Sequence, residues 1–363
     1  MKLAPFLLER WLLHPCTYDL ASAGITKLKL KDLTTDIDYE MLMAYGITKG
    51  SRLIREQIAG LYENVDAENI LVTSGTAEAN LLTLMRLLEP GDECIALLPT
   101  YLQCVNLAKS FGAEVKCCHY QEDDGYRPAM TRLRDLATSR TKLIVCVNPN
   151  NPTGSVITGD EMRTMCEIAD GVGAWILCDG ALRGLEVEGG TASSPVEVYE
   201  RGIATGSLSK LGLTGIRIGW LAANKELIDE CWAYKDYTTL CHPGIGEHLA
   251  QIALQRTNFA RYIERAQGII RTNRGILSEW VSAYNPVVQW VQPKAGHTAF
   301  IAYDLDVDSE SLCRQVLQEE GVLVSPGDYF GSSKHLRVRY SCDSQILEGA
   351  LERLGRNLAR RRT

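Results

Sequence analysis

The sequence lacks the features that are typical of membrane proteins, repeat proteins and metal-binding proteins. It has no apolar run long enough to cross a bilayer, and it contains no internal repeat, low-complexity segment or flexible linker. Its twelve cysteines are scattered, several of them within apolar runs, and none has the spacing of metal ligands. We therefore interpret them as reduced thiols of a cytoplasmic protein and expect no metal site.

The sequence also lacks a positive charge excess that would favour nucleic acid. Its 363 residues carry a formal net charge of −7, and the basic stretch from Arg356 to Arg362 is typical of a solvated helix end. The apolar N-terminus is interrupted by Glu9 and Arg10, and no small-residue cleavage site follows. It is therefore expected to form an amphipathic helix rather than a signal peptide. We expect neither a nucleic acid nor a membrane as a partner.

What the chain does contain is an alternation of apolar, β-type runs with longer helical patterns. This pattern predicts an α/β fold with a mainly parallel sheet between helices. Seven strands are expected in this part, at residues 70–73, 93–98, 114–118, 143–147, 174–178, 202–205 and 216–222. After about residue 240, a long helical region leads to shorter strands at 298–303, 322–325 and 336–340, which predict a smaller α+β domain.

We divide the chain accordingly into three parts. Residues 1–40 form an N-terminal segment that is expected to pack with the small domain. Residues 41–240 form the large domain, where a cofactor is expected. Residues 241–363 form the small C-terminal domain, including the connecting helix.

Residues that carry chemistry follow the predicted strands, at the edge where open α/β sheets bind their ligands. Ser74, Gly75 and Thr76 open a helix, so their N–H groups and hydroxyls can hold a phosphate at the positive end of the helix dipole. The same turn is also typical of an ordinary helix N-cap. Asn151 lies in the turn Asn148-Pro-Asn-Asn-Pro-Thr-Gly154, where it can donate a hydrogen bond or simply form part of a loop.

Lys210 is the most informative residue. It follows small hydroxyl residues and precedes a glycine and Arg217, which suits an amine that forms a Schiff base beside a bound phosphate. Asp179 ends a predicted strand, where it can supply the counter-charge of a pyridinium nitrogen or act as a surface cap. Tyr101 follows another strand and can stack on a ring or pack in the core. The implied cofactor is pyridoxal 5′-phosphate.

The order of these pieces resembles that of the class I and II aminotransferases, which are fold-type-I enzymes that depend on pyridoxal phosphate. The resemblance covers nearly the whole chain, from Gly24 through Tyr45-Gly-Ile-Thr-Lys-Gly50 to Arg337. It implies a seven-stranded, mainly parallel sheet in a fold-type-I transferase, with a smaller α+β domain. It also implies a homodimer that transfers the amino group of an L-amino acid to a 2-oxo acid.

The resemblance implies roles for individual residues of the cofactor site. Lys210 resembles the Schiff-base lysine, Asp179 the partner of the pyridine nitrogen, and Tyr101 the tyrosine that stacks on the ring in catalysis. Asn151 resembles the donor to the ring 3-oxygen. The phosphate is expected to bind a cup that includes a tyrosine of the neighbouring subunit; its members are Ser74, Gly75, Thr76, Ser207, Ser209, Arg217 and Tyr45.

The resemblance also implies how the substrate binds. Arg337 is similar to the arginine that pairs with the substrate α-carboxylate in a bidentate fork, aided by Asn151 and by the backbone near Gly24. Arg339 is a rival for the same role. An acidic residue such as Glu78 facing the side-chain pocket would favour a basic substrate. Four further residues border the site in relatives and are expected to be structural: Tyr18, Lys27, His242 and His297.

Two departures from the family pattern favour a specialised reaction. Leu182 stands three residues after Asp179, where many relatives have a tyrosine that binds the ring 3-oxygen. The spacing from Lys210 to Arg217 is one residue shorter than usual. In addition, short segments at 19–25, 235–240 and 321–331 resemble the capreomycidine synthase-like branch, whose members cyclise a hydroxyarginine by elimination and internal addition.

We therefore expect amino transfer. The alternative is elimination, replacement or cyclisation of an amino acid, for which the resemblance to the capreomycidine synthase-like branch suggests an arginine-derived substrate. Oxidation of an arginine-like substrate by oxygen has no separate signature in the sequence. An alternative of another class is a non-catalytic regulator that binds pyridoxal phosphate. Such regulators usually carry a DNA-binding domain, for which the chain leaves no room before the fold begins, and both Lys210 and Asp179 are retained.

Overall fold

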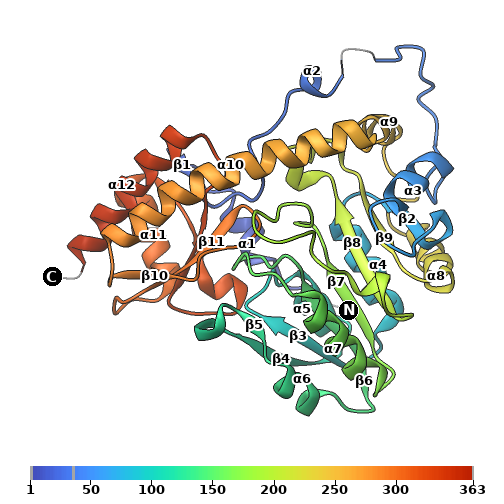
Figure 1. The fold of residues 1–363 in the computed structure, drawn as a ribbon, viewed down its shortest axis with the longest axis horizontal. Coiled ribbons are helices and arrows are strands. Elements are labelled where there is room, and N and C mark those ends of the chain that lie inside the picture. Colours follow the sequence, from blue (N-terminus) through green and yellow to red (C-terminus); the bar gives the residue numbers. More distant parts are fainter. Residues whose placement is uncertain (1–2, 35–36, 362–363) are drawn as a thin grey trace.

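The computed structural model describes residues 3–34 and 37–361. The chain forms a large lobe around an eight-stranded sheet and a small lobe around a four-stranded sheet (Figure 1). The strands of the large sheet are β2 (Ile70–Thr73), β3 (Glu93–Leu98), β4 (Glu114–Gln121), β5 (Arg127–Pro128), β6 (Thr141–Val147), β7 (Trp175–Asp179), β8 (Gly202–Ser207) and β9 (Gly219–Ala222). Their order in space is β2-β9-β8-β7-β6-β3-β4-β5.

The large sheet is mainly parallel. Neighbouring strands from β8 to β4 run parallel, β9 is antiparallel to both β8 and β2, and β5 is antiparallel to β4. The seven strands expected from the sequence are present, and the two-residue strand β5 adds an eighth at the edge. The fold is thus that of an α/β protein with the predicted parallel sheet.

Both faces of most of the large sheet are buried, which explains why β2, β3, β6 and β7 are largely apolar. In β2, Ile70 and Val72 face one core while Leu71 faces the other. The Leu71 face is covered by α4 (Thr76–Leu87), α5 (Gln103–Ser110) and α8 (Lys225–Lys235). The other face packs with α7 (Gly159–Asp170) and shares its core with the small lobe. Helices α3 (Arg52–Ala59) and α6 (Met130–Leu136) complete the large lobe.

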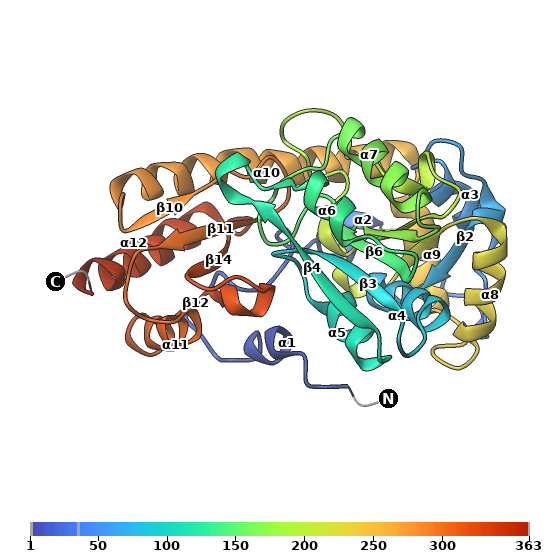
Figure 2. The ribbon, with the colours of Figure 1, turned by 90° about the horizontal axis from the view of Figure 1, so that it is seen from below.

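The small lobe has an antiparallel sheet in the order β10-β11-β14-β13. Its strands are β10 (Val288–Trp290), β11 (Thr298–Tyr303), β13 (Ser325–Pro326) and β14 (His335–Arg339). Helices α11 (Ser309–Glu320) and α12 (Ser344–Arg360) pack on it, while α9 (Gly244–Ala253) and the 28-residue α10 (Arg256–Ala283) connect the lobes. Figure 2 shows α1 (Leu7–Trp11) between α11 of the small lobe and α5 of the large lobe.

Two predicted strands differ from the structure in their bounds. The strand expected at 216–222 begins only at Gly219, because Thr214–Ile216 forms a 3₁₀ turn and Arg217 adopts a left-handed conformation with φ 55°. The strand expected at 322–325 is divided between two sheets. Its first part, β12 (Val322–Leu323), pairs in parallel with β1 (Tyr18–Asp19) of the N-terminal segment, and β13 pairs with β14.

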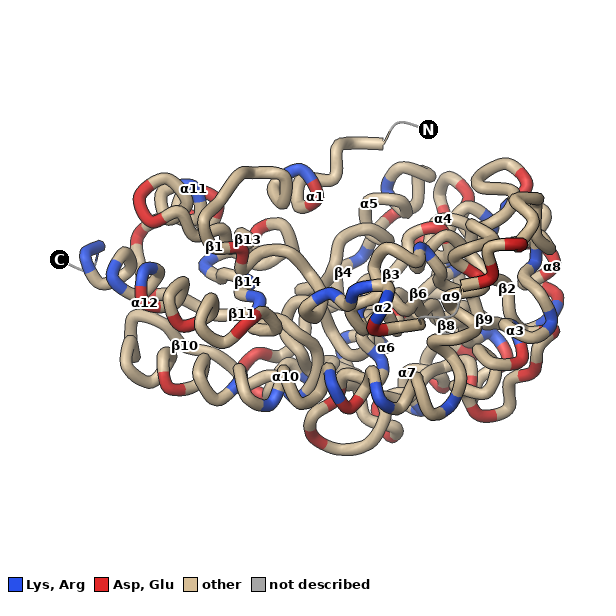
Figure 3. The backbone as a smooth tube through the Cα atoms, turned by 90° about the horizontal axis from the view of Figure 1, so that it is seen from above, with Lys and Arg blue, Asp and Glu red and all other residues tan. Residues whose placement is uncertain are grey.

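The basic C-terminal stretch is paired within the small lobe. Arg361 contacts Glu319 at 2.7 Å, and Arg360 and Arg356 contact Glu320 at 3.4 and 3.8 Å. These ion pairs join the end of α12 to α11. Figure 3 marks basic positions along the end of α12 and acidic positions on α11. Residue 362 lies outside the described residues. The arginines therefore support the packing of two helices rather than forming an isolated basic patch.

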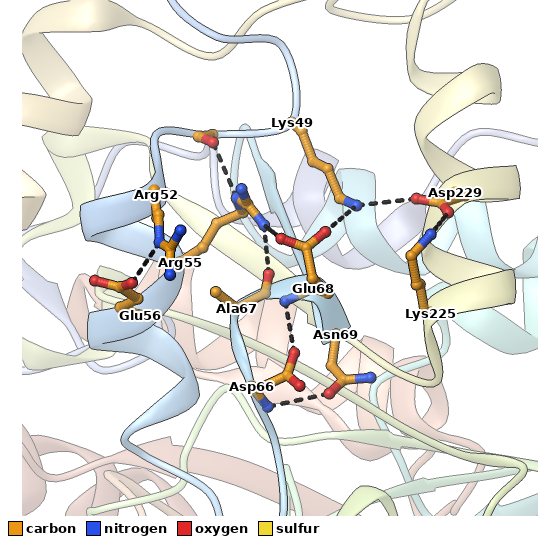
Figure 4. Close-up of polar contacts among 11 residues, drawn as sticks. Lys49, Arg52, Arg55, Glu56, Asp66, Ala67, Glu68, Asn69, Lys225 and Asp229 are labelled. Atoms are coloured by element: carbon orange, nitrogen blue, oxygen red, sulfur yellow. Dashed lines mark hydrogen bonds and ion pairs between the residues drawn. The ribbon is translucent and has the colours of Figure 1, made fainter.

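Residues 37–48 form an exposed arm between α2 (Leu30–Leu33) and α3. The root of this arm is fixed by an ion-pair network on the large lobe (Figure 4). Lys49 contacts Asp229 at 2.9 Å and Glu68 at 3.5 Å, and Arg55 contacts Glu68 at 3.1 Å and the Gly50 carbonyl at 3.1 Å. The arm therefore leaves the large lobe from a defined position.

Within the described residues, no helix is both long and apolar enough to span a membrane. Nor does that part of the chain hold a cluster of three or more His, Cys, Asp or Glu side chains that is suited to a metal ion. All twelve cysteines lie in it, and each is a free thiol.

Candidate active site

A cavity of about 420 Å³ lies where the carboxyl ends of β6, β7 and β8 meet α1 and the small lobe. This is the edge of the sheet at which parallel α/β folds bind ligands. Strand ends, the start of α4, β14 of the small lobe and α1 all contribute to its wall. The charged side chains of the wall are Glu9, Asp179, Lys210, Arg217 and Arg337.

Lys210 lies in the short turn Ser209–Leu211, directly after β8, and its side chain lines the cavity. Burial and the nearby Arg337 guanidinium lower the pKa of the Lys210 ammonium, while Glu9 and Asp179 act in the opposite direction, and the resulting pKa is about 8. About a tenth of the amine is therefore neutral at pH 7. A neutral amine in an enclosed cavity is a nucleophile and a base.

Asp179 ends β7 with only 5% of its surface exposed. Its carboxylate accepts hydrogen bonds from Asn80 Nδ2 at 2.9 Å and from the Ala181 N–H at 3.0 Å. Burial raises the pKa of the Asp179 carboxyl, and these hydrogen bonds and the Lys210 charge oppose that rise. Such a carboxylate is suited to hold a cationic N–H group within the cavity.

Asn80 was not predicted as a site residue. It projects from α4, and its side-chain oxygen accepts a hydrogen bond from Thr205 Oγ1 at 2.9 Å while its nitrogen reaches Asp179. Thr205 lies in β8, so the amide is held between two neighbouring strands. The signal in the sequence is an asparagine within a helical segment that is otherwise rich in Ala and Leu. A buried amide in such a position requires hydrogen-bond partners.

The turn Ser74-Gly75-Thr76 places the N-terminus of the 12-residue helix α4 at the cavity. Gly75 is the N-cap residue and has φ 90°, a conformation that L side chains rarely adopt. Thr76 lines the cavity, and its hydroxyl oxygen is buried without a hydrogen-bond partner among the described residues. Free N–H groups at a helix N-terminus and an unpaired hydroxyl form a suitable anion site.

Arg217 completes this end of the cavity. Its left-handed backbone conformation turns the side chain back toward the start of α4, where Nη2 donates a hydrogen bond of 3.1 Å to the Ser74 carbonyl. Ser207 and Ser209 line the cavity near it. The spacing between Lys210 and Arg217 is short, yet the 3₁₀ turn and the positive φ bring both residues to the same cavity.

Arg337 lies in β14 with 1% of its surface exposed. Its Nη2 donates to the Ala21 carbonyl and, at 3.2 Å, to Ser325 Oγ, and Nη1 donates to Asn151 Oδ1 at 3.3 Å. The guanidinium lies 4.7 Å from the centre of the Phe330 ring. Burial lowers the Arg337 pKa to about 10, and Nε has no partner among the described residues. A buried, incompletely paired guanidinium suits a carboxylate ligand.

The structure separates Arg337 from its rival. Arg339 does not line the cavity, and its guanidinium lies 3.6 Å from the Asp19 carboxylate. Gly24 is buried beside the cavity wall, which its neighbour Ala23 helps to form. The Gly24 carbonyl accepts a hydrogen bond of 2.8 Å from Ser341 Oγ. The N-terminal segment is thus attached to the small lobe next to the cavity.

Tyr101 and α1 form the mouth of the cavity. The Tyr101 hydroxyl donates a hydrogen bond of 2.9 Å to Glu9 Oε1, and the Phe6 ring lies 5.0 Å from the Tyr101 ring. Burial and the Glu9 carboxylate both raise the pKa of the Tyr101 phenol, so it remains a hydrogen-bond donor. The sequence predicted an amphipathic helix at the N-terminus but did not indicate that this helix belongs to the site. The signal was Glu9, which interrupts an apolar run.

Leu182 lines the cavity, whereas Tyr45 lies away from it. Leu182 is buried in its wall, so an apolar side chain stands where many relatives were expected to have a phenol. Tyr45 lies in the exposed arm with 85% of its surface exposed and does not line the cavity of its own chain.

Glu78 does not face the cavity, contrary to the hypothesis that it contacts a substrate side chain. Its carboxylate accepts hydrogen bonds from the Ser74 N–H at 2.7 Å, Thr238 Oγ1 at 2.6 Å and Thr239 Oγ1 at 2.7 Å. It therefore supports the turn at the start of α4. The four bordering residues are also outside the set that lines this cavity: Tyr18, Lys27, His242 and His297.

These groups fit pyridoxal 5′-phosphate. The helix terminus with the unpaired Thr76 hydroxyl suits its phosphate, the buried Asp179 carboxylate suits its ring nitrogen, and the Lys210 amine suits its aldehyde. All three lie along one continuous cavity.

The chain is similar to known proteins over most of its length. A family model described as aminotransferase class I and II matches residues 25–354. Capreomycidine synthase from Streptomyces vinaceus is 28% identical over 364 aligned residues, which cover 97% of this chain and 93% of that protein. The aspartate/prephenate aminotransferase of Thermus thermophilus is 28% identical over 331 residues, covering 88% and 85%. The crystal structure of a PLP-dependent aminotransferase from Streptococcus suis 89-1591 has a TM-score of 0.92 and 37% identity, covering 99% of each chain.

Proposed function

The chain belongs to the class I and II aminotransferase family, and on this premise we propose that it transfers the α-amino group of an L-amino acid to a 2-oxo acid. The family match extends over residues 25–354, and the cofactor of the family is pyridoxal 5′-phosphate. The observation that carries the proposal is the presence of Lys210, Asp179 and Arg337 around one cavity. These residues are an amine, a counter-charge and a carboxylate-binding group.

When bound, pyridoxal 5′-phosphate supplies an aldehyde for amines and a ring that accepts the electron pair released at the substrate Cα. Lys210 would hold the aldehyde carbon, and Asp179 would hold a proton on the ring nitrogen. Thr76, Arg217 and the N-terminus of α4 would bind the phosphate. Asn151, which already receives a hydrogen bond from Arg337, would orient the ring oxygen. The Tyr101 ring would cover the ring face.

The substrate would bind through its α-carboxylate to Arg337. The guanidinium is prevented from moving by hydrogen bonds to the Ala21 carbonyl and to Ser325, so its remaining N–H groups present a fixed donor pattern. Lys210 lines the same cavity as Arg337, so its amine would lie close to the Cα of a bound substrate. With a pKa near 8, the amine would be able to accept the proton released at the substrate Cα and to donate it again.

The exposed arm supports a homodimer. Its large apolar side chains are exposed to an unusual degree: Tyr39, Leu42, Met43, Tyr45 and Ile47. A contiguous apolar segment of this kind is typical of a surface that is covered by a partner. We propose that Tyr45 enters the phosphate site of the second subunit, which the network around Lys49 makes feasible by fixing the root of the arm.

A second candidate is elimination, replacement or cyclisation of an amino acid, in particular one derived from arginine. Two observations favour it: Leu182 removes a phenol donor from the cavity wall, and the similarity to capreomycidine synthase covers 97% of the chain. In this reaction Lys210 would remove the same Cα proton. A leaving group would then depart from the substrate side chain, and the amino group would stay on the product.

The deciding experiment mixes the purified holoprotein with a panel of L-amino acids without any oxo acid and analyses cofactor and products by mass spectrometry. Amino transfer requires pyridoxamine phosphate together with the matching 2-oxo acid. Consumption of an amino acid with the cofactor unchanged supports the second candidate instead. Lys210→Ala is the control and must abolish either reaction. A wild-type protein that neither binds pyridoxal phosphate nor alters any amino acid would overturn both candidates.

A further inference from the structure

Four of the five charged side chains that line the cavity have proposed partners in the cofactor or in the common part of the substrate. Lys210, Asp179 and Arg217 are used by the cofactor, and Arg337 is used by the α-carboxylate. None of these contacts requires Glu9. The carboxylate of Glu9 is therefore available to a part of the substrate that differs between amino acids, namely the side chain.

Helix α1 holds Glu9 at the mouth of the cavity. Leu8 and Trp11, on the buried side of the helix, are 1% and 2% exposed. Trp11 Nε1 donates a hydrogen bond of 2.7 Å to the Val324 carbonyl, and the Arg314 guanidinium lies 5.3 Å from the centre of the Trp11 ring. Glu9 is an exposed residue that also lines the cavity. Its position is thus set by the anchored face of the helix.

The negative charge of Glu9 has no fixed cationic partner among the described residues. One carboxylate oxygen accepts the hydrogen bond from the neutral Tyr101 hydroxyl, and no Lys, Arg or His in the described part of the chain forms an ion pair with Glu9. Its charge nevertheless acts across the cavity, because it raises the pKa of both Lys210 and Arg337. Glu9 therefore faces the same space in which the substrate would bind.

We infer that Glu9 selects L-amino acids whose side chain ends in a cation, an amine or a guanidinium. The inference rests on the proposed function, because it concerns the side chain of the same substrate. A cationic group can donate charge-assisted hydrogen bonds to the second Glu9 oxygen. The neighbouring wall includes Phe6, Leu12 and Leu182, which suit the methylene stem of such a side chain. An acidic side chain would instead meet a like charge.

The test compares L-arginine with L-citrulline, which has nearly the same shape but no charge. Dissociation constants are measured for both amino acids from the cofactor absorbance of the holoprotein, and product formation is followed in single turnovers. In the wild type we expect arginine to bind more tightly than citrulline. Because Glu9 is exposed and screened by water, we expect Glu9→Gln to reduce the ratio of the citrulline to the arginine dissociation constant by about tenfold. Glu9→Lys should reverse the preference in favour of L-glutamate.

The matched control is Glu352→Gln, which removes an exposed carboxylate from α12, away from the cavity, and should leave the preference unchanged. Cofactor content and the melting temperature show whether each variant is folded. Equal binding of arginine and citrulline by the wild type, or an unchanged preference in Glu9→Gln, overturns the inference while leaving the proposed function intact. A holoprotein whose absorbance responds to no amino acid contradicts the proposed function itself.

Discussion

Asn80 Nδ2 donates a hydrogen bond of 2.9 Å to Asp179 Oδ2, and the opposite end of the same amide accepts one of 2.9 Å from Thr205 Oγ1. These two hydrogen bonds connect α4, which begins at the proposed phosphate site, with β7, which ends at Asp179, and with β8. Because all three residues are buried, the orientation of the Asp179 carboxylate is fixed before any ligand binds.

Replacement of Asn80 by alanine should therefore weaken cofactor chemistry without removing any group that contacts the cofactor. We expect kcat/KM for the best amino acid to fall about tenfold or more, since a hydrogen bond to a charged group is lost. In addition, the pH at the midpoint of the change in cofactor absorbance should differ between the Asn80→Ala holoprotein and the wild type. Thr205→Val, which removes only the support of Asn80, should shift both properties in the same direction by a smaller amount. A role of Asn80 limited to folding stability would leave the absorbance profile unchanged.

The lowered pKa of Lys210 predicts how the apoprotein takes up its cofactor. The neutral amine attacks an aldehyde, and with a pKa near 8 its neutral fraction increases as the pH rises through that value. The rate of pyridoxal phosphate attachment, followed by absorbance, should therefore increase between about pH 7 and pH 9 with a midpoint near 8. Arg337→Met removes a positive charge that lowers this pKa, so its midpoint should move to higher pH. A midpoint near the ordinary lysine pKa in the wild type would contradict the prediction.

Gly75 is predicted to be irreplaceable at the start of α4. A Cβ there would lie 2.6 Å from Arg217 Nη2, and φ is 90°. Gly75→Ala should therefore displace Arg217 and lower the affinity for pyridoxal phosphate at least about tenfold. Gly91→Ala is the matched control, because Gly91 has φ 94° but no atom within 4 Å of its Cβ position. That variant should lose about 1 kcal/mol of stability and keep its cofactor affinity, measured by equilibrium titration.

The parts of the molecule that the sequence predicted are those that depend on local pattern. The strands that end at Leu98, Val147 and Asp179 are short apolar runs followed by turn residues, so their positions could be predicted closely. Pattern alone was misleading at 216–218, where two isoleucines continue an apolar run but Arg217 has a positive φ. The pattern of apolar residues does not predict the turn at Thr214–Ile216, which brings Arg217 to the cavity.

The parts that the sequence did not predict depend on contacts between distant segments. Asn80 and Asp179 are separated by 99 positions, and Glu9 and Tyr101 by 92. Each pair meets only after a helix has packed against the sheet or the small lobe. Glu78 gives the converse case, because its acidic side chain was considered for the substrate pocket but is satisfied by Thr238 and Thr239 of a different segment. Residue type identified the chemistry, whereas packing determined which residue supplies it.

The proposed exchange of Tyr45 between subunits leads to a complementation experiment. Lys210→Ala removes the amine of its own site, and Tyr45→Ala impairs the site of the neighbouring subunit. A mixed dimer therefore contains one site with both native residues and one site with neither. After unfolding and refolding of an equal mixture, about a quarter of the sites should be intact, and activity should exceed that of either variant alone.

The control for this experiment is an equal mixture of Lys210→Ala with Asn80→Ala. Each of these substitutions impairs the site of its own chain. The mixed dimer therefore has no intact site, and its activity should not exceed the mean of the two variants. Because the exposed arm leaves the large lobe at the ion-pair network around Lys49, Lys49→Met should weaken complementation by releasing the root of the arm. Sedimentation of the holoprotein as a monomer, or activity of the Tyr45→Ala and Lys210→Ala mixture equal to the sum of its separate parts, would exclude the exchange. A gain in activity that occurs only in the mixture of Tyr45→Ala and Lys210→Ala would place Tyr45 in the partner's site. Two variants that each impair only the site of their own chain cannot form an intact site in a mixed dimer.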